Sequence, residues 1–346
     1  MIVSICNMKK YSTFIVFIAL TLLLQAAVCQ ENDAGGARIM FYNVENLFYI
    51  YDDSITADEE FLPQGAMRWS YTRYNRKISS LFKTITAAGE WSPPEIVAFC
   101  EVENRLVLND LISRTYLNRF DYEIVHEDSP DPRGIDVCLI YRKDRIKLLT
   151  YRYLKPDLPN NTKFTTRSVL YASFLLNTDT LHVFVNHWPS RRGGTLAGEG
   201  MRIKIAEMEK SFCDSILLRN PQSKILIGGD FNSMPGGKEI GVLLNDLTGN
   251  GLINLSEGLA AKGRGTYRYR GSWEMIDQIL VSKPLLDNKS AIFTNELNLS
   301  IFDADFLLMD DPLYPGVSPN PTYRGRRYNG GFSDHLPVLV DIHFNE

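Results

Sequence analysis

Two periodicities of apolar residues alternate along this chain of 346 residues. Alternating or continuous β-prone runs predict strands, and apolar residues three or four positions apart predict helices. The predicted helices cover residues 74–88, the segment around 108–112 and residues 201–218. The predicted strands cover residues 38–42, 95–100, 122–126, 136–141, 146–154, 169–176, 181–185, 224–227, 278–281 and 338–342. Strands with few intervening helices favour packed sheets flanked by helices in one domain.

Residues 303–331 lack this periodicity and are rich in proline and tyrosine, with Arg324, Arg326 and Arg327 among them. The composition predicts one long loop. Long loops in compact domains usually carry function or move.

The N-terminus has the pattern of a targeting segment. Residues 14–24 are apolar apart from Thr21, and Lys9 and Lys10 precede them. The run is too short for a membrane span and is typical of a secretory signal. Because the two lysines follow Met8 directly, we expect translation to start there.

We therefore expect a signal peptide over residues 1–29, a short polar linker over 30–37 and a single domain over 38–346. The end of the signal leaves two alternatives. We favour simple cleavage after residue 29, which would export the protein to the periplasm or the extracellular space. The alternative is a lipid anchor on Cys29, although Val28 is larger than the residue expected before a lipidated cysteine. Neither alternative leaves a transmembrane span in the mature chain.

Composition excludes few classes of protein. Hydrophobic residues make up 45% of the chain and the formal net charge is -4, so no global basic field attracts nucleic acid. A local basic cleft with a bound metal could still bind nucleic acid. Cys100, Cys138 and Cys213 are widely spaced in apolar runs, which indicates buried thiols rather than a disulfide framework.

Polar groups follow several of the predicted strands directly. In Gly228-Gly229-Asp230-Phe231-Asn232, the glycines permit a tight turn after a buried strand. An extended chain would place Asp230 and Asn232 on one side, where they could orient a water molecule and an oxyanion. A plain Asx turn is the alternative interpretation.

Asp334 and His335 form a second polar pair, in which Asp334 could face a metal and His335 the substrate. A single histidine is more often a hydrogen-bonded core residue. Asp277, however, is a carboxylate inside an apolar run, and a buried charge needs a partner. A protonated His335 is the natural partner.

His187 leaves the predicted strand 181–185 and is followed by Arg191 and Arg192. An imidazole and two guanidinium groups suit an anionic ester, and a solvated loop is the alternative for the arginines.

Asn43 and Glu101 also end predicted strands, so both could reach a shared pocket mouth. Glu45 and Glu103 lie two positions further along, and either could be the actual ligand. Oxygen ligands combined with imidazoles, without thiolates, indicate a hard cation and hydrolysis.

Taken in order, these segments resemble one known group of proteins, the endonuclease/exonuclease/phosphatase superfamily, which is deoxyribonuclease I-like. The superfamily also includes abasic-site endonucleases, inositol-polyphosphate phosphatases and bacterial sphingomyelinases. The resemblance covers residues 38–344 and is closest to exported, endonuclease-like bacterial members. It is carried by Asn43-x-Glu45-Asn46, Glu101, His187, Gly229-Asp230-x-Asn232, Asp277 and Ser333-Asp334-His335.

The resemblance implies an α/β (α+β) fold, a four-layer sandwich of two mostly antiparallel β-sheets flanked by helices. It also implies a Mg²⁺ ion, with Mn²⁺ or Ca²⁺ as substitutes. Glu101 would be the main metal ligand, with Asp334 and Asn43 nearby.

The catalytic roles implied by the resemblance fall on five residues. Asp230 and Asn232 would position the attacking water and the phosphate. His335, paired with Asp277, would bind the phosphate or transfer a proton. His187 matches a position that is His in some relatives and Tyr in others, and from its basic neighbours in the sequence we expect it to add positive charge.

Three arginines are weaker candidates for phosphate binding. Arg167 matches a phosphate-contacting arginine of the superfamily loosely, and Arg191 belongs to a basic cluster that could border the cleft. Arg133 is a further candidate, although its segment could equally be a structural turn.

The sequence thus predicts a secreted, divalent-metal-dependent phosphoesterase that hydrolyses a phosphodiester, with an endonuclease acting on DNA or RNA as the first choice. A phosphatase or phospholipase C-like enzyme, acting on inositol phosphates or sphingomyelin, is the alternative. A catalytically silent binding protein is less favoured because no position of the set is missing. No stable protein partner is implied.

Overall fold

A computed structural model describes residues 35–53, 56–90, 92–157, 166–191, 195–246 and 249–345. The expected start at Met8, the signal peptide over 1–29 with Cys29, most of the linker and Arg192 lie outside the described residues. Ala37–Glu346 form one compact unit. None of the helices in the described ranges is long and apolar enough to cross a membrane.

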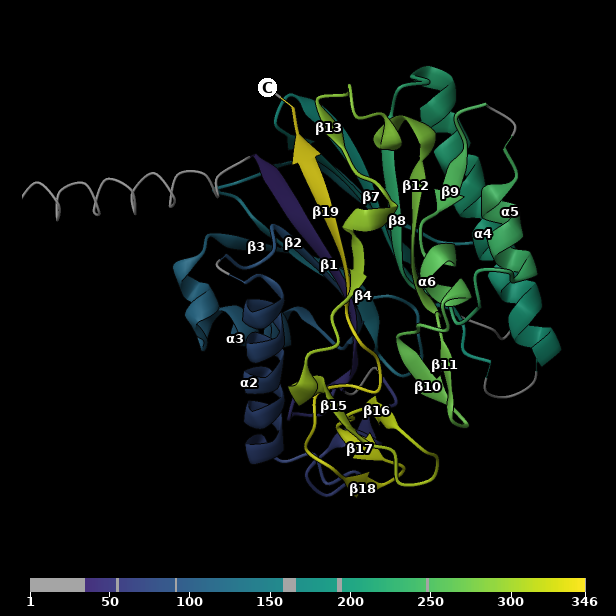
Figure 1. The fold of residues 1–346 in the computed structure, drawn as a ribbon. Coiled ribbons are helices and arrows are strands. Elements are labelled where there is room, and N and C mark those ends of the chain that lie inside the picture. Colours follow the sequence, from purple (N-terminus) through teal and green to yellow (C-terminus); the bar gives the residue numbers. More distant parts are fainter. Residues whose placement is uncertain are drawn as a thin grey trace, which may run out of the picture. The chain divides into compact units, whose positions relative to one another are not determined.

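Two large sheets lie at the centre of this unit (Figure 1). The first has the order β13-β19-β1-β2-β4-β3, with β14 beside β19. Its strands are β1 (Gly36–Leu47), β2 (Ile96–Val102), β3 (Tyr122–Val125), β4 (Asp136–Arg142), β13 (Ile292–Phe293), β14 (Leu299–Ile301) and β19 (Val338–Phe344). Strands β1 and β2 are parallel, whereas β2–β4, β3–β4, β13–β19 and β14–β19 are antiparallel.

The second sheet has the order β5-β6-β7-β8-β12-β9. Its strands are β5 (Lys147–Leu154), β6 (Val169–Leu176), β7 (Asp179–His187), β8 (Lys224–Asp230), β9 (Leu252–Asn254) and β12 (Asp277–Ser282). Only β7 and β8 pair in parallel in this sheet, and the other pairs are antiparallel. The expectation of two mostly antiparallel sheets is confirmed.

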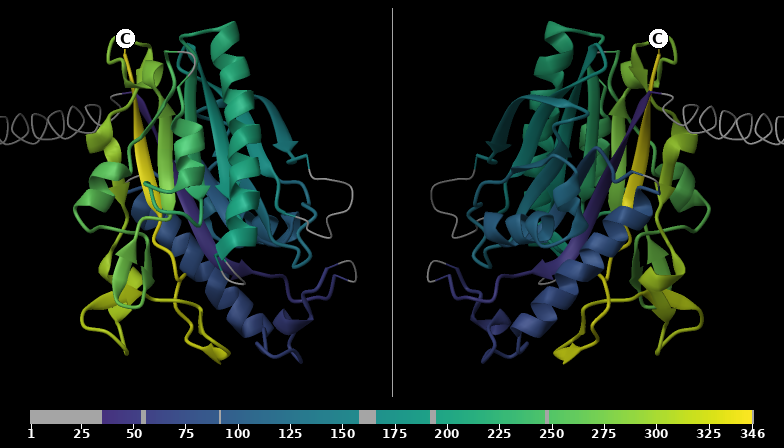
Figure 2. Two further views of the ribbon diagram at one scale, coloured as in Figure 1. Left: turned by 90° about the vertical axis from the view of Figure 1, so that its right-hand side faces the viewer. Right: turned by 90° about the vertical axis from the view of Figure 1, so that its left-hand side faces the viewer.

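Helices cover the outer faces of both sheets (Figures 1 and 2). Helices α2 (Tyr71–Ala88) and α3 (Arg105–Ser113) pack on the first sheet, and α4 (Thr195–Arg219) and α5 (Lys238–Leu244) pack on the second. A short helix, α6 (Glu257–Ala261), follows β9. The order helix, sheet, sheet, helix is the four-layer sandwich that the resemblance implied.

Side-chain alternation builds three apolar layers from these elements. In β1, Phe41 points between the sheets, whereas its neighbour Met40 packs under α2 and α3. In β8, Leu226 points between the sheets, whereas Ile227 packs under α4 and α5. Each fully buried side chain of this size contributes about 1.5–3 kcal/mol. Strands that are apolar on both faces are therefore the expected result of a sheet covered on both sides.

The expectation of one long loop over residues 303–331 is wrong in part. This segment contains a short 3₁₀ helix, Asp305–Leu307, and two small hairpins. The hairpin strands are β15 (Leu308–Asp310), β16 (Val317–Pro319), β17 (Tyr323–Arg324) and β18 (Arg327–Tyr328). The hairpin of β10 (Tyr267–Tyr269) and β11 (Ser272–Glu274) was also missed. Strands of two or three residues are too short to show a period of two.

The two glycines after the predicted strand 224–227 do not form the expected tight turn, because β8 continues through both of them. Gly229 pairs with Asn186 of β7, and its φ is +130°. A Cβ atom at this position would lie 2.1 Å from the Asn186 carbonyl oxygen. Glycine is therefore needed for the close approach of β7 and β8, which places the residues that follow both strands next to each other.

Candidate active site

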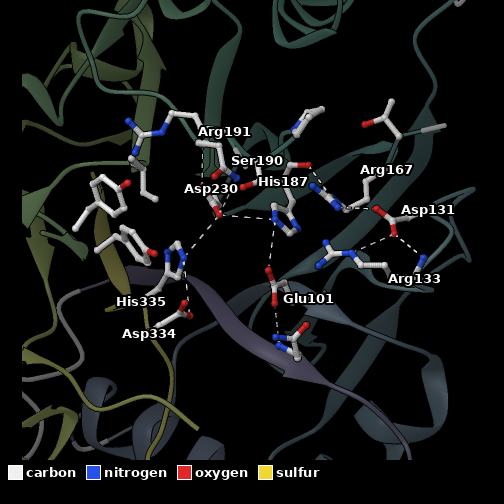
Figure 3. Close-up of a pocket in the computed structure, with 17 residues that line it drawn as sticks. Glu101, Asp131, Arg133, Arg167, His187, Ser190, Arg191, Asp230, Asp334 and His335 are labelled. Carbon is white, nitrogen blue, oxygen red and sulfur yellow. Dashed lines mark hydrogen bonds and ion pairs between the residues drawn. The ribbon is translucent and has the colours of Figure 1, made fainter. Parts of the chain in front are cut away.

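A cavity of about 680 Å³ lies where strand ends from both sheets meet (Figure 3). The parallel pairs β1–β2 and β7–β8 deliver their carboxyl ends to it, and β12 begins there. Nine of the residues predicted from the sequence line this cavity: Glu101, Arg133, Arg167, His187, Arg191, Asp230, Asn232, Asp334 and His335.

Asp230 lies at the end of β8 in the centre of this group and is 2% exposed. Its Oδ1 accepts a hydrogen bond from the Asn232 backbone N–H (2.8 Å). Its Oδ2 accepts from Asn43 Nδ2 (3.1 Å) and Asn232 Nδ2 (3.2 Å). The Asx turn and the paired side chains, which were alternatives on sequence grounds, therefore coexist.

The protonation of Asp230 follows from its surroundings. Burial raises the pKa of its carboxyl group to about 7, against the opposing effect of His335. A carboxyl group with such a pKa can accept a proton from water near neutral pH.

His335 and Asp277 form the pair expected from the sequence. His335 Nδ1 lies 2.7 Å from Asp277 Oδ2, which also accepts a 2.5 Å hydrogen bond from Thr266 Oγ1. Burial alone would lower the pKa of His335, but Asp277 and then Asp230 raise it well above its usual value. The imidazole is therefore cationic at neutral pH, with Nε2 3.9 Å from Asp230 Oδ2.

His187 is in the opposite state. Burial, Arg167 and Arg133 lower the pKa of His187 well below its usual value, so the ring is neutral at neutral pH. The lowered pKa disfavours a positive charge on His187, and its role as a source of charge stays a prediction. Its Nε2 lies 3.7 Å from both Glu101 Oε1 and Asp230 Oδ2.

Glu101 faces the cavity because the backbone of β2 is distorted there. Its φ is +65°, and the register with β4 shifts between Cys100 and Val102. Such a bulge interrupts the alternation of side chains and re-aims one of them. The Asn46 backbone N–H donates to Glu101 Oε2 at 2.9 Å.

The two open alternatives, Glu45 and Glu103, do not line the cavity. Glu45 accepts hydrogen bonds from the backbone N–H groups of Thr322 and Tyr323, so it anchors the last hairpin. Glu103 Oε2 accepts a 2.5 Å hydrogen bond from the Tyr49 backbone N–H. Glu101 is therefore the glutamate presented to a ligand.

Glu101 and Asp334 are suited to hold a hard divalent cation. Their side chains are 16% and 35% exposed within the cavity wall, and none of the three described cysteines, all buried, lines the cavity. Carboxylate oxygens with room for water are the environment that Mg²⁺ prefers. The residues present therefore fit the metal expected from the sequence.

Two other placements bear on the metal. Asn43 lies behind Asp230 rather than in the cavity wall, and its Oδ1 accepts from the Glu45 backbone N–H. Ligand atoms of Asp230, Asp277 and His335 lie within 4.8 Å of one another. We interpret this group as a proton-transfer chain, since the close Asp277 oxygen already serves His335 and Thr266.

The arginines occupy the two flanks of the cavity (Figure 3). Arg167 is buried: its guanidinium pairs with Asp131 (2.6 Å) and donates to the carbonyl oxygens of His187 and Trp188. These two hydrogen bonds from Arg167 fix the backbone at the end of β7. Arg133, with a 51% exposed side chain, keeps its guanidinium at the cavity edge. On the other flank, Arg191 pairs with Glu274 of β11.

Several lining residues were missed from the sequence. Asp131 lies in an irregular turn, and Tyr267 and Tyr269 lie on the short β10 strand. The Tyr267 ring packs against His335 with centroids 4.9 Å apart. No motif marks these residues, because their position depends on hairpins that have no detectable period.

Comparisons with known proteins agree with this geometry. A model of the Endonuclease/Exonuclease/phosphatase family matches residues 38–344. No curated protein matches the chain.

Solved structures share the fold at low sequence identity. The catalytic domain of human Nocturnin with bound sulfate is 16% identical, with a TM-score of 0.54 over 90% of this chain and 95% of that chain. An endonuclease/exonuclease/phosphatase from Bacteroides vulgatus is 16% identical, with a TM-score of 0.55 over 90% and 99%. D. rerio TDP2 complexed with single-strand DNA product is 12% identical, with a TM-score of 0.54 over 89% and 99%.

Proposed function

Since the chain belongs to the endonuclease/exonuclease/phosphatase family, whose enzymes hydrolyse phosphoester bonds, we propose that it is an exported, Mg²⁺-dependent phosphodiesterase acting on nucleic acid. The proposed chemistry rests on one observation: the buried Asp230, with its raised pKa, lies between two histidines.

Two residues would handle the protons. Asp230, oriented by Asn43 and Asn232, takes a proton from the attacking water. His335, kept cationic by Asp277, donates a hydrogen bond to a phosphate oxygen and stabilises the charge that develops there. The neutral His187 fills the space between Glu101 and Asp230.

Glu101 and Asp334 would hold the Mg²⁺ ion, which supplies positive charge for the phosphate oxygens. Asn46 orients Glu101 through its backbone N–H. The left-handed backbone at Asn46 and Glu101, with φ values of +55° and +65°, fixes this ligand in place.

The preference for nucleic acid rests on the flanks of the cavity. Arg191 and Arg133 lie on opposite sides of the catalytic group (Figure 3), and Tyr267 and Tyr269 line the wall. Cationic groups on both sides suit a chain with several phosphates, and tyrosines suit stacking against bases. A monoester would use only the central groups.

Export is proposed from the apolar run over residues 14–24. Mass spectrometry of the mature protein should find an N-terminus directly after residue 29, without lipid. A diacylglyceryl group on Cys29 would instead establish the anchored form.

A substrate panel tests the activity. Purified mature protein is incubated with supercoiled DNA, RNA, sphingomyelin, inositol phosphates and bis(p-nitrophenyl) phosphate, with Mg²⁺ or with chelator. We expect nicking of DNA or cleavage of RNA with Mg²⁺ and none with chelator. Hydrolysis of sphingomyelin or inositol phosphates, with DNA and RNA intact, would replace the nuclease assignment.

A further inference from the structure

One lysine of this protein is buried in the apolar face of a helix. Lys77 shares that face of α2 with Tyr74, Ile78 and Leu81, and it is only 1% exposed. Lysine is almost never fully buried unless its ammonium group is paired, because removing the charge from water is costly. The contacts of this ammonium group therefore indicate why the position is not apolar.

The Lys77 ammonium group holds the segment that leads into Asp334. Its Nζ donates to Thr322 Oγ1 at 2.6 Å and to the Phe332 carbonyl oxygen at 2.5 Å. Thr322 lies directly before the β17–β18 hairpin and Phe332 lies after it, so one side chain ties the two ends of the hairpin together. Phe332 is two residues from Asp334.

Glu45 of β1 binds the same segment. Its carboxylate accepts hydrogen bonds from the backbone N–H groups of Thr322 and Tyr323, at 2.5 and 3.0 Å. A lysine that is 1% exposed and a glutamate that is 6% exposed thus contact Thr322 from two different elements. Their opposite charges reduce the cost of burying each.

Ser333 and His335, on either side of Asp334, are held separately. Ser333 Oγ donates to the Asn43 carbonyl oxygen at 2.7 Å and accepts from the His335 backbone N–H at 3.1 Å. The His335 ring also contacts the second sheet through β12. Loss of the contact with α2 should therefore displace Asp334 more than His335.

We propose that Lys77 is a positioning residue for the metal site: by holding Phe332 it places Asp334 in the cavity wall with Glu101 before the metal binds. The inference rests on the proposed function, in which these two carboxylates hold the ion. Lys77 does not line the cavity, so it acts through Asp334. Mg²⁺ requires near-ideal geometry, and a carboxylate that is already in place loses less conformational freedom when the ion binds.

Metal binding without substrate tests this role. K77M removes the ammonium group and keeps the apolar stem. K224M is the matched control, because Lys224 is also buried, at 3%, and donates to the Gln222 carbonyl oxygen at the opposite end of β8 from Asp230. Binding of Mn²⁺ is measured by electron paramagnetic resonance of the free ion. We expect K77M to raise the Kd about tenfold and K224M to leave it unchanged, although both lower the Tm.

The D334N background shows whether Lys77 acts through Asp334. D334N alone should weaken Mn²⁺ binding. Adding K77M to D334N should then change the Kd by less than about twofold, because the residue that Lys77 positions is no longer a ligand. A further tenfold loss in the D334N background would contradict a role through Asp334.

T322V keeps the test decisive if K77M does not fold. It removes one acceptor of the Lys77 ammonium group at nearly constant volume and should raise the Kd for Mn²⁺ about threefold. An unchanged or lower Kd in T322V, or in a folded K77M, would show that Lys77 only stabilises the fold. Failure of the wild-type protein to bind Mn²⁺ would instead overturn the proposed metal site, and this inference with it.

Discussion

The two flanks of the cavity shift the pKa of a histidine in opposite directions. On one flank, His335 contacts Asp277 and lies near Asp230, and its pKa is raised. On the other, His187 lies near Arg167 and Arg133, and its pKa is lowered. Both rings are buried, so burial lowers the pKa of each. Both rings lie near carboxylates, but only His335 contacts one directly, at 2.7 Å from Asp277. His187 has guanidinium groups nearby instead, and this difference gives the two pKa shifts their opposite directions.

We therefore expect the two flanks to have different roles. In the proposed mechanism, the His335 flank holds the groups that exchange protons, whereas Arg167 on the His187 flank holds the backbone of the cavity wall. Substitutions on the first flank should mainly reduce turnover, and substitutions on the second should mainly affect stability and substrate binding.

The largest effect is expected at Asp230, the carboxylate that both flanks share. D230A removes the proton acceptor and should lower kcat by about 10³-fold, with an unchanged circular dichroism spectrum. The exposed Asp305 provides the matched control, D305A, which should retain full activity. A D230A variant with more than a tenth of wild-type turnover would contradict the assigned role.

D277N tests the charge on the His335 flank. Asp277 raises the pKa of His335, so its loss lets the imidazole deprotonate at a lower pH. Activity should therefore fall by about 10²-fold at pH 8 and by less at pH 6, as a pH–kcat profile would show.

The control for this charge is T266V, which removes a hydrogen bond to Asp277 but keeps the carboxylate. T266V should lose far less activity and retain the wild-type profile. Identical profiles for D277N and the wild type would mean that Asp277 does not set the charge of His335.

Two arginines on the His187 flank should respond differently to the same change. R167A removes the 2.6 Å partner of the buried Asp131 and leaves it only the exposed Arg133 at 3.7 Å, so it should lower the free energy of unfolding by about 3 kcal/mol. R133A removes an exposed guanidinium and should raise KM by about tenfold without changing stability. Urea unfolding and steady-state kinetics measure both, and equal stability losses would end the distinction between framework and binding arginines.

The smallest effect concerns Glu209 of α4, which supports the His187 flank from behind. Its Oε1 accepts from Asn186 Nδ2, and Asn186 Oδ1 accepts from Trp188 Nε1. Burial raises the pKa of Glu209 to about 8, so the folded state holds a proton that the unfolded state releases above about pH 4.5. Stability should therefore decline as pH rises from about 4.5 to 8.

E209Q keeps the neutral shape of this side chain and should remove that decline. At pH 8 it should be more stable than the wild type by on the order of 2 kcal/mol, with equal stability near pH 4.5 and unchanged turnover at pH 7. Urea unfolding at pH 5, 6.5 and 8 measures the slope. Parallel slopes for the two proteins would show that Glu209 is ionised in the folded state.

The longer elements could be predicted from the sequence because burial imposes a period on many residues at once. The strand ending at Asp230 and the helix over residues 201–218 are examples. The β10–β11 and β15–β16 hairpins were missed, and with them Tyr267 and Tyr269 of the cavity wall. Their position depends on contacts between hairpins rather than on any local pattern.

Residue type and order alone indicated the kind of chemistry. Carboxylates, amides and imidazoles at successive strand ends predicted hydrolysis with a hard cation, and their order carried the resemblance that implied a phosphoester. Only the tertiary structure chose Glu101 over Glu103, because a bulge in β2 breaks the alternation that would have made them equivalent. It also decided that the pKa of His335 is raised and that of His187 lowered. The reason is physical: a pKa depends on charges a few ångströms away, and those charges come from residues far apart in the chain.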